Sequence, residues 1–179
     1  MTRFTVSATL LALCLHAGNA VALADETPAD IATGILPLVT YGITWAKDDD
    51  EGGYQFLRSA GVSLVLNSAL RLAFNETDWG ERPNGSPYGF PSGHTAFVVS
   101  SAAFLQDRYG WKYGLPAYLV VGYVSWVRVD TDHHRWRDVI AGAALSYGVS
   151  KLFVTPQNAT HIAPIVGPEW FGLRIERSF

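Results

Sequence analysis

The chain of 179 residues has a single cysteine, Cys14, close to its N-terminus. Around it, Arg3 precedes the apolar stretch Leu10–Leu15, and Ala22-Leu23-Ala24 offers the small residues after which a signal peptidase cleaves. We therefore expect residues 1–24 to be a signal peptide. An uncleaved membrane anchor is the alternative, because the segment after Arg3 carries no charge. Cleavage would remove the thiol, which excludes disulfides and cysteine-built metal sites from the mature protein.

Charged residues are scarce, at 16% of the chain, where about a quarter is typical. The formal net charge of −3 gives no reason to expect a nucleic-acid partner. Lysine is rare among the basic residues, since three lysines stand against ten arginines. Because a planar guanidinium group binds phosphate through two hydrogen bonds, this bias points weakly to an anionic ligand.

Five apolar segments follow, each rich in Ala, Leu, Val and Gly and each too long for a single strand. They predict helices over Ile31–Ala46, Ser59–Leu70, Thr95–Leu105, Tyr113–Val127 and Val139–Ser150. Short polar joints are expected at Lys47–Gly53, Arg108–Gly110 and Thr131–His134. The expected fold class is therefore all-α, with a single helical bundle of about five core helices in a domain over residues 25–155.

Long hydrophobic runs are missing from this bundle. The predicted helices fall short of the ~20 residues that a bilayer crossing needs, which favours helices buried in a protein core. Against this, four tryptophans lie near segment ends, where an interfacial aromatic belt would place them. They are Trp45, Trp111, Trp126 and Trp136. Membrane association is expected, but the sequence does not separate a bundle docked on a membrane from one embedded in it.

Two segments interrupt the helical pattern. From about Asn75 to Gly89 the chain is rich in Gly, Pro, Asn and charge, and so long a loop in a tight bundle is commonly functional or disordered. Beyond Pro156, the stretches Ile162–Val166 and Phe171–Ile175 alternate as strands do, on either side of a turn-forming Gly-Pro-Glu. Residues 156–179 are therefore expected to form a C-terminal tail with a short β-hairpin.

The first of three polar patches is Arg128, then five residues, His134, then three residues, Asp138. If the last helix extends back to His134, the histidine and Asp138 share one face about a turn apart. The carboxylate would then accept a hydrogen bond from one ring nitrogen and leave the other nitrogen free as a nucleophile or general base. The alternative is an ordinary helix-surface contact.

The second patch is Pro91-Ser92-Gly93-His94, directly before an apolar run. Ser92 is a plausible N-cap, and the backbone N–H groups that follow a cap point out of the helix end. Such an end binds anions. His94 could there hold a proton for an oxygen of the bound anion. The alternative is a capped helix with an incidental histidine.

The third patch is cationic. Arg71, Arg82 and Arg128 each flank an apolar segment, where an unpaired guanidinium is poorly placed unless an anion or a carboxylate meets it. Single arginines are common at helix ends. Three of them, together with two histidines and a helix end that can bind an anion, are much less common.

The three patches resemble the three-part signature of the type 2 phosphatidic acid phosphatase family, which is shared with bacterial class A acid phosphatases and vanadium haloperoxidases. The family pattern is Lys-x6-Arg-Pro, then Pro-Ser-Gly-His, then Ser-Arg-x5-His-x3-Asp. The second part is matched in full here. In the third part the spacing selects His134 rather than His133, and the resemblance extends over the helical order from about Asp30 to Phe153.

Two departures from the family pattern affect the site. Val127 stands where the family often has the serine before Arg128, which removes one hydroxyl group. Counting back from Arg82, the position of the lysine is taken by Asn75, which has no charge. We expect four extra residues in the loop, with Arg71 in the role of the lysine.

The resemblance implies phosphoester hydrolysis in two steps without a metal or other cofactor. It makes His134 the nucleophile that forms a phosphohistidine, Asp138 the residue that orients it, and His94 the proton donor to the leaving alkoxide. The implied ligands of the phosphoryl oxygens are Arg71, Arg82, Arg128 and the N–H groups of Ser92 and Gly93.

The implied substrates are phosphate monoesters or pyrophosphates. With an exported chain, these would be envelope lipids or small phosphoesters, hydrolysed in the periplasm or at the inner membrane with the site facing the periplasm. Two alternatives stay open from the sequence. One is a vanadate-dependent haloperoxidase, and the other is a phosphate- or lipid-binding module without turnover.

Overall fold

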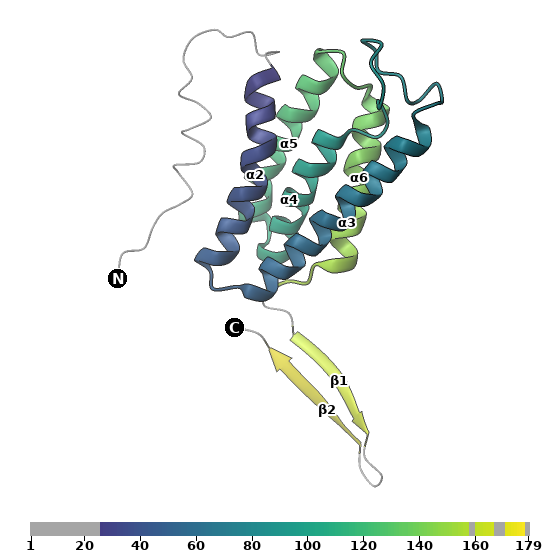
Figure 1. Ribbon diagram of the computed structural model, residues 1–179. Coiled ribbons are helices and arrows are strands. Elements are labelled where there is room, and N and C mark those ends of the chain that lie inside the picture. Colours follow the sequence, from purple (N-terminus) through teal and green to yellow (C-terminus); the bar gives the residue numbers. More distant parts are fainter. Residues whose placement is uncertain (1–25, 158–159, 167–170, 178–179) are drawn as a thin grey trace.

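The computed structural model describes residues 26–157, 160–166 and 171–177. The expected signal peptide lies outside the described residues. Within them the chain forms five helices followed by two strands (Figure 1). The helices are α2 (Glu26–Ala46), α3 (Asp50–Phe74), α4 (Gly93–Tyr109), α5 (Trp111–Asp130) and α6 (Trp136–Phe153). The prediction of an all-α bundle of five helices is confirmed.

Helix α4 is the centre of the bundle and contacts each of the other four helices. Around it the order is α5, α2, α3 and α6, because α2 packs on both α5 and α3, and α3 packs on α6. Buried side chains of α4 and α5 form much of the core: Val98, Ala102, Phe104, Val124 and Val127. Helices α5 and α6 both pack on α4, and they leave a groove between them.

The helices are longer than the sequence predicted, and the first two joints are shorter, whereas the third extends by one residue to 131–135. Helix α3 begins at Asp50, not at Ser59, because the side chain of Asp49 caps it by accepting a 2.9 Å hydrogen bond from the N–H of Gly52. The joint between α4 and α5 is Gly110 alone, whose φ of 83° lies in the left-handed region that glycine tolerates.

A buried ion pair ties together the end of the bundle opposite the long loop. Asp49 accepts hydrogen bonds from Nη2 of Arg108 at 2.5 Å, from Nε of Arg108 at 2.8 Å and from the hydroxyl of Tyr109 at 2.8 Å. Arg108 also donates to the carbonyl of Thr155 at 2.9 Å. Burial alone would raise the pKa of Asp49, but the hydrogen bonds from Arg108 and Tyr109 lower it to about 2.

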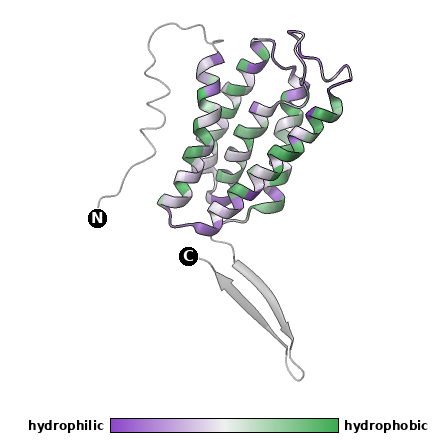
Figure 2. Cartoon of the chain, in the orientation of Figure 1, coloured by the Kyte–Doolittle hydropathy of each residue, from purple (hydrophilic) through white to green (hydrophobic). Residues whose placement is uncertain are grey.

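The outer surface of the bundle is unusually apolar. Among its exposed large side chains, Leu38 is 73% exposed, Trp45 and Leu152 are 80% exposed, and Val65 is 68% exposed. Polar residues gather instead in the connections at the two ends of the bundle (Figure 2). Among the described residues, the helices include none with the length and apolar character to cross a membrane.

Strands β1 (Thr160–Val166) and β2 (Phe171–Arg177) pair in antiparallel register, with Thr160 opposite Arg177 and Val166 opposite Phe171. Residues 167–170, where the sequence predicts the turn, lie outside the described residues. The C-terminal hairpin therefore stays a prediction.

Candidate active site

The structure brings the candidate residues of all three patches to one end of the bundle, at the top of Figure 1. This end is formed by the C-terminal ends of α3 and α5, the N-terminal ends of α4 and α6, and the loop between α3 and α4. The candidates are Arg71, Arg82, Ser92, Gly93, His94, Arg128, His134 and Asp138. The charges of Arg71 and Arg82 act on both histidines of this group and lower the pKa of each.

His134 is 2% exposed, and its ring is held by the backbone of the long loop. Its Nδ1 lies 2.7 Å from the carbonyl oxygen of Gly89. Since a carbonyl can only accept, Nδ1 carries the hydrogen, and the lone pair belongs to Nε2. The sequence predicted Asp138 as the hydrogen-bond partner, but its carboxylate is 3.9 Å from Nδ1. The reason is that α6 begins at Trp136, so the helix does not extend back to His134.

The imidazole of His134 is held neutral. Burial lowers its pKa to about 3, and the charges of Arg82 and Arg71 act in the same direction, whereas the hydrogen bond to Gly89 acts against it. At neutral pH the ring therefore has a free lone pair on Nε2. A buried, neutral and oriented imidazole is suited to nucleophilic attack.

Asp138 is fully buried and joins the starts of two helices. Its carboxylate accepts a 2.7 Å hydrogen bond from the N–H of Arg135, which caps α6. Its carbonyl oxygen accepts a 2.9 Å hydrogen bond from the N–H of Ser92, the N-cap of α4. At Gly142 of α6, a Cβ atom would lie 2.5 Å from the carbonyl oxygen of Ser92, so only glycine permits this contact.

The predicted cap of α4 is present, because the hydroxyl of Ser92 accepts a hydrogen bond from the N–H of Thr95 at 3.4 Å. His94 follows in the first turn of α4 and is partly exposed. Burial lowers the pKa of His94, and the charges of Arg71 and Arg82 lower it further. In the free protein His94 is therefore more readily deprotonated than a histidine in water.

Three arginines belong to this end of the bundle, and the guanidinium group of one of them, Arg71, lies beside the start of α4. Among the described residues, the Nε atoms of Arg71, Arg82 and Arg128 are buried without a hydrogen-bond partner. Burial lowers the pKa of Arg71, and the charge of Arg82 lowers it further, so these two cations lie close together. A Cβ atom at Gly93 would lie 3.3 Å from Nη1 of Arg71, which puts this guanidinium beside the first residue of α4. Unpaired buried donors of this kind match an anionic ligand.

Both candidates for the role of the missing lysine contact the loop, and Nη2 of Arg71 donates to the carbonyl oxygen of Tyr88 at 3.2 Å. The side chain of Asn75 is engaged in the loop, because its Oδ1 accepts from the N–H of Tyr88 at 3.0 Å and its Nδ2 donates to Glu76 at 2.9 Å. Of the two, Arg71 carries the charge that lowers the pKa of His94 and of His134. Val127, at the position of the expected serine, is buried in the core.

Two acidic residues of α2 reach the same place, which the sequence did not indicate. Arg128, whose side chain is 3% exposed, contacts Asp30 through Nη2, and its Nη1 lies 3.6 Å from Glu26. Asp30 also lies 3.2 Å from Nε2 of His94. Neither carboxylate belongs to a recognisable motif, and both lie in the short stretch after the expected cleavage position, so no sequence signal pointed to them.

The long loop is packed against the turn between α5 and α6. Aromatic rings anchor it: the centroids of Trp79 and Phe90 are 4.8 Å apart, and those of Phe74 and Phe90 are 5.0 Å apart. Arg135 donates to the carbonyl of Glu81 at 2.5 Å. The loop thereby holds Gly89 against His134. Within the described ranges, no group of three or more His, Cys, Asp or Glu side chains is arranged to hold a metal ion.

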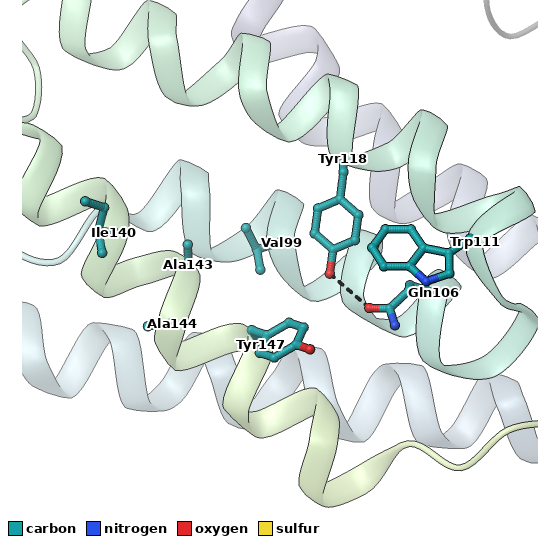
Figure 3. Close-up of a pocket in the computed structure, with 8 residues that line it drawn as sticks. All are labelled: Val99, Gln106, Trp111, Tyr118, Ile140, Ala143, Ala144 and Tyr147. Carbon is teal, nitrogen blue, oxygen red and sulfur yellow. Dashed lines mark hydrogen bonds between the residues drawn. The ribbon is translucent and has the colours of Figure 1, made fainter.

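An apolar groove of about 510 Å³ runs along the outside of the bundle between α5 and α6, with α4 as its floor (Figure 3). Its lining residues are Val99, Gln106, Trp111, Tyr118, Ile140, Ala143, Ala144 and Tyr147. Ile140, at one end of the groove, lies in the first turns of α6 as Asp138 does, but Ile140 is 63% exposed whereas Asp138 is fully buried. The polar contact drawn there joins the hydroxyl of Tyr118 to Gln106 at 3.4 Å.

Comparison with known proteins identifies the family. A family model described as the PAP2 superfamily matches residues 65–161, which include the candidate site residues from Arg71 to Asp138. The chain belongs to the PAP2 superfamily. As in other members of a shared family, the activity has to be argued from the site itself.

Curated relatives of this PAP2 protein include two phosphatases of Helicobacter pylori strain J99. The chain is 28% identical to the lipid A 1-phosphatase of that strain over 145 residues, which cover 78% of the chain and 76% of the relative. It is 34% identical to its lipid A 4'-phosphatase over 128 residues, which cover 67% of the chain and 65% of the relative. A solved transmembrane PAP2-type phosphatidylglycerolphosphate phosphatase from Bacillus subtilis aligns with a TM-score of 0.46 and 24% identity, over 81% of the chain and 89% of that structure.

Proposed function

We propose that this PAP2 protein is a lipid phosphatase of the cell envelope that hydrolyses phosphate monoesters or pyrophosphates through a phosphohistidine at His134. That it is a phosphoric ester hydrolase follows from its family and from its phosphatase relatives. The observation that carries the mechanism is the neutral, buried His134, whose Nδ1 donates to Gly89 and whose Nε2 lone pair is free.

In the first step, Nε2 of His134 attacks phosphorus and the bond from phosphorus to the leaving oxygen breaks. The electron pair goes to that oxygen, which takes a proton from His94. In the second step, water attacks phosphorus, His94 accepts its proton, and the bond to Nε2 breaks. Asp138, 3.9 Å from Nδ1, would stabilise the positive charge that the ring gains in the intermediate.

The phosphoryl oxygens would be held by Arg71, Arg82 and Arg128 and by the N–H groups at the start of α4. Two observations support this assignment of the phosphate ligands. The Nε atoms of the three arginines are buried without hydrogen-bond partners, and Ser92 caps a helix end of the kind that binds anions. Preorganised donors of this kind stabilise the charge that develops in the transition state, and we propose that they do so without a metal ion.

His94 must carry a proton to act as the general acid. In the free protein, burial and the charges of Arg71 and Arg82 lower its pKa. A bound phosphate would offset both arginine charges, so substrate binding would itself raise the proton affinity of His94. General acids contribute ~10²–10⁴ in rate.

Two observations support a lipid as the substrate. The relatives with the highest identity given above act on lipid A according to their names. The apolar groove of Figure 3 would take a hydrocarbon chain beside the site, since it is lined mainly by apolar and aromatic side chains. The exposed apolar side chains of the bundle support association with a membrane. We place the active site on the periplasmic side, because of the predicted signal peptide.

The experiment is a phosphate-release assay on the purified full chain with lipid A, phosphatidate, phosphatidylglycerol phosphate and a lipid diphosphate, with and without a chelator. Wild-type protein should release phosphate from at least one lipid in the presence of the chelator, and His134→Asn should release none. Rapid acid-free quenching with a radiolabelled substrate should trap phosphate on wild-type protein but not on His134→Asn. Equal release by the two proteins would overturn the nucleophile assignment.

A further inference from the structure

We propose that Asp30 of α2 is a competing carboxylate, which occupies the place of a phosphoryl oxygen in the free protein and sets the affinity of the site for phosphate. The inference rests on the proposed function, since it concerns the same phosphate site. Asp30 lies outside the matched range 65–161 and outside the three motifs.

The position of one oxygen atom carries the argument. Oδ1 of Asp30 contacts Nη2 of Arg128 and lies 3.2 Å from Nε2 of His94. A phosphate bound on Arg128 and ready to accept a proton from His94 needs an oxygen at this same place. The carboxylate and the phosphate therefore cannot occupy the site together.

Burial explains why a carboxylate is present when phosphate is absent. The side chain of Arg128 is 3% exposed, and a guanidinium so deeply buried requires a counter-charge. Among the described residues, the carboxylates in contact with it are those of Asp30 and Glu26. They neutralise the cation until a substrate replaces them.

Asp30 can leave this place at small cost, because its own side chain is 52% exposed. Released from Arg128, it points to water, where a carboxylate is fully hydrated. The incoming phosphate gains Arg71, Arg82 and Arg128 together, and a dianion gains more from three cations than a single carboxylate does. Asp30 thus raises the concentration at which phosphate fills the site and favours doubly charged phosphate groups over weaker anions.

The test measures the affinity of the full chain for inorganic phosphate by calorimetry, for wild type, Asp30→Asn and Asp30→Ala. In wild type, phosphate can bind only to the fraction of molecules in which Asp30 has left the site. If this fraction is small, removing the carboxylate raises the apparent affinity for phosphate by the inverse of that fraction. Both variants should bind phosphate about tenfold more tightly than wild type. Asp48→Asn is the matched control, because Asp48 is an exposed aspartate in the turn between α2 and α3, at the opposite end of the bundle. It should bind as wild type does.

Steady-state kinetics separate competition from a role in proton transfer. For Asp30→Asn, KM for a phosphomonoester should fall about tenfold while kcat stays within about twofold. A fall in kcat with unchanged KM and unchanged phosphate affinity would make Asp30 a permanent partner of His94 and overturn the proposal. So would equal phosphate affinity in wild type and both variants, or no binding in any of them.

The two proposals fail in different ways. If wild type turns over no phosphoester but Asp30→Asn binds phosphate more tightly, the proposed function fails and the competition stands. If wild type is an active phosphatase and Asp30→Asn has the same KM and phosphate affinity, only the competition fails.

Discussion

Nδ1 of His134 donates a 2.7 Å hydrogen bond to the carbonyl oxygen of Gly89. A backbone carbonyl thereby does what a carboxylate does in many catalytic histidine pairs, because it fixes which ring nitrogen carries the hydrogen. Gly89 belongs to the loop between α3 and α4, so the loop orients the ring of the proposed nucleophile. The carboxylate of Asp138 is left to cap α6 and to act on His134 from 3.9 Å.

Asp138→Asn should therefore be a mild variant. Where an aspartate fixes the tautomer, its change to asparagine costs about 10⁴ in kcat. Here Gly89 keeps the tautomer, and the Asn side chain can still accept from the N–H of Arg135, so we expect a loss of only about 10- to 100-fold through the missing charge. The measurement is kcat for phosphate release, with His134→Asn as the inactive reference. A loss as large as that of His134→Asn would contradict the Gly89 assignment.

His94→Asn should be sensitive to the leaving group. A lipid alkoxide needs a proton to leave, whereas p-nitrophenolate leaves without one. We expect kcat to fall ~10²–10⁴ on a lipid phosphate and at most severalfold on p-nitrophenyl phosphate. Inorganic phosphate should still bind, because the arginines are untouched. Equal losses on the two substrates would argue against proton donation by His94.

Acid should destabilise the fold through His134. Its folded pKa of about 3 lies below the ordinary 6.5, so between these values the unfolded chain binds a proton that the folded chain does not. Its contribution to stability is complete above pH 6.5 and declines as the pH falls towards 3. From pH 6.5 to 5 the free energy of unfolding should fall by about 2 kcal/mol. Denaturant unfolding at the two pH values should show a smaller fall for His134→Asn, and identical falls would refute the assignment.

The ion pair between Asp49 and Arg108, at the end of the bundle opposite the candidate site, should support the stability of the fold and not catalysis. Asp49 and Arg108 have side chains only 5% and 7% exposed, so Asp49→Ala leaves a buried, unpaired guanidinium. We expect a loss of about 3–5 kcal/mol in the free energy of unfolding. The double variant Asp49→Leu/Arg108→Met should recover part of it. Turnover per folded molecule at low temperature should stay near that of wild type, and a selective loss of kcat would contradict this separation.

Filling the groove should discriminate between chain lengths. Ala144→Trp adds a large side chain to the groove beside Tyr147. If this displaces about two methylene groups of a substrate chain, kcat/KM should fall about tenfold for a long-chain alkyl phosphate. A short-chain phosphate should be almost unaffected. Leu152→Trp is the matched control, since Leu152 lies on the same helix, is 80% exposed and does not line the groove. Equal effects of the two variants would exclude a chain-binding groove.

The architecture was predictable because it depends on residue classes. Five apolar segments separated by polar joints can bury their faces only by packing together, and Ser92 before a helical run is a standard cap. The ends of the helices were less predictable. The cluster from Asp48 to Gly53 has the composition of a loop. Helix α3 nevertheless begins within this cluster, because the side chain of Asp49 accepts a hydrogen bond from the N–H of Gly52 and caps the helix.

The contacts that decide the site were hidden for two physical reasons. The partner of His134 is a backbone carbonyl, which every residue has, so nothing in the identity of Gly89 reveals it. Asp30 lies far from Arg128 in sequence and meets it only when α2 packs on α5. Spacing along the chain identifies groups on one element, but it carries no information on such long-range pairs.

Gly142 contributes no charge, no proton and no donor side chain, yet the start of α4 depends on it. A single methyl group there would lie 2.5 Å from the carbonyl oxygen of Ser92 and would push the two helix starts apart. The N–H groups at the start of α4 would then be displaced from the guanidinium group of Arg71, which lies beside Gly93. In a survey of all single substitutions, position 142 should rank with the histidines for lost activity, and a search restricted to chemically reactive residues would miss it.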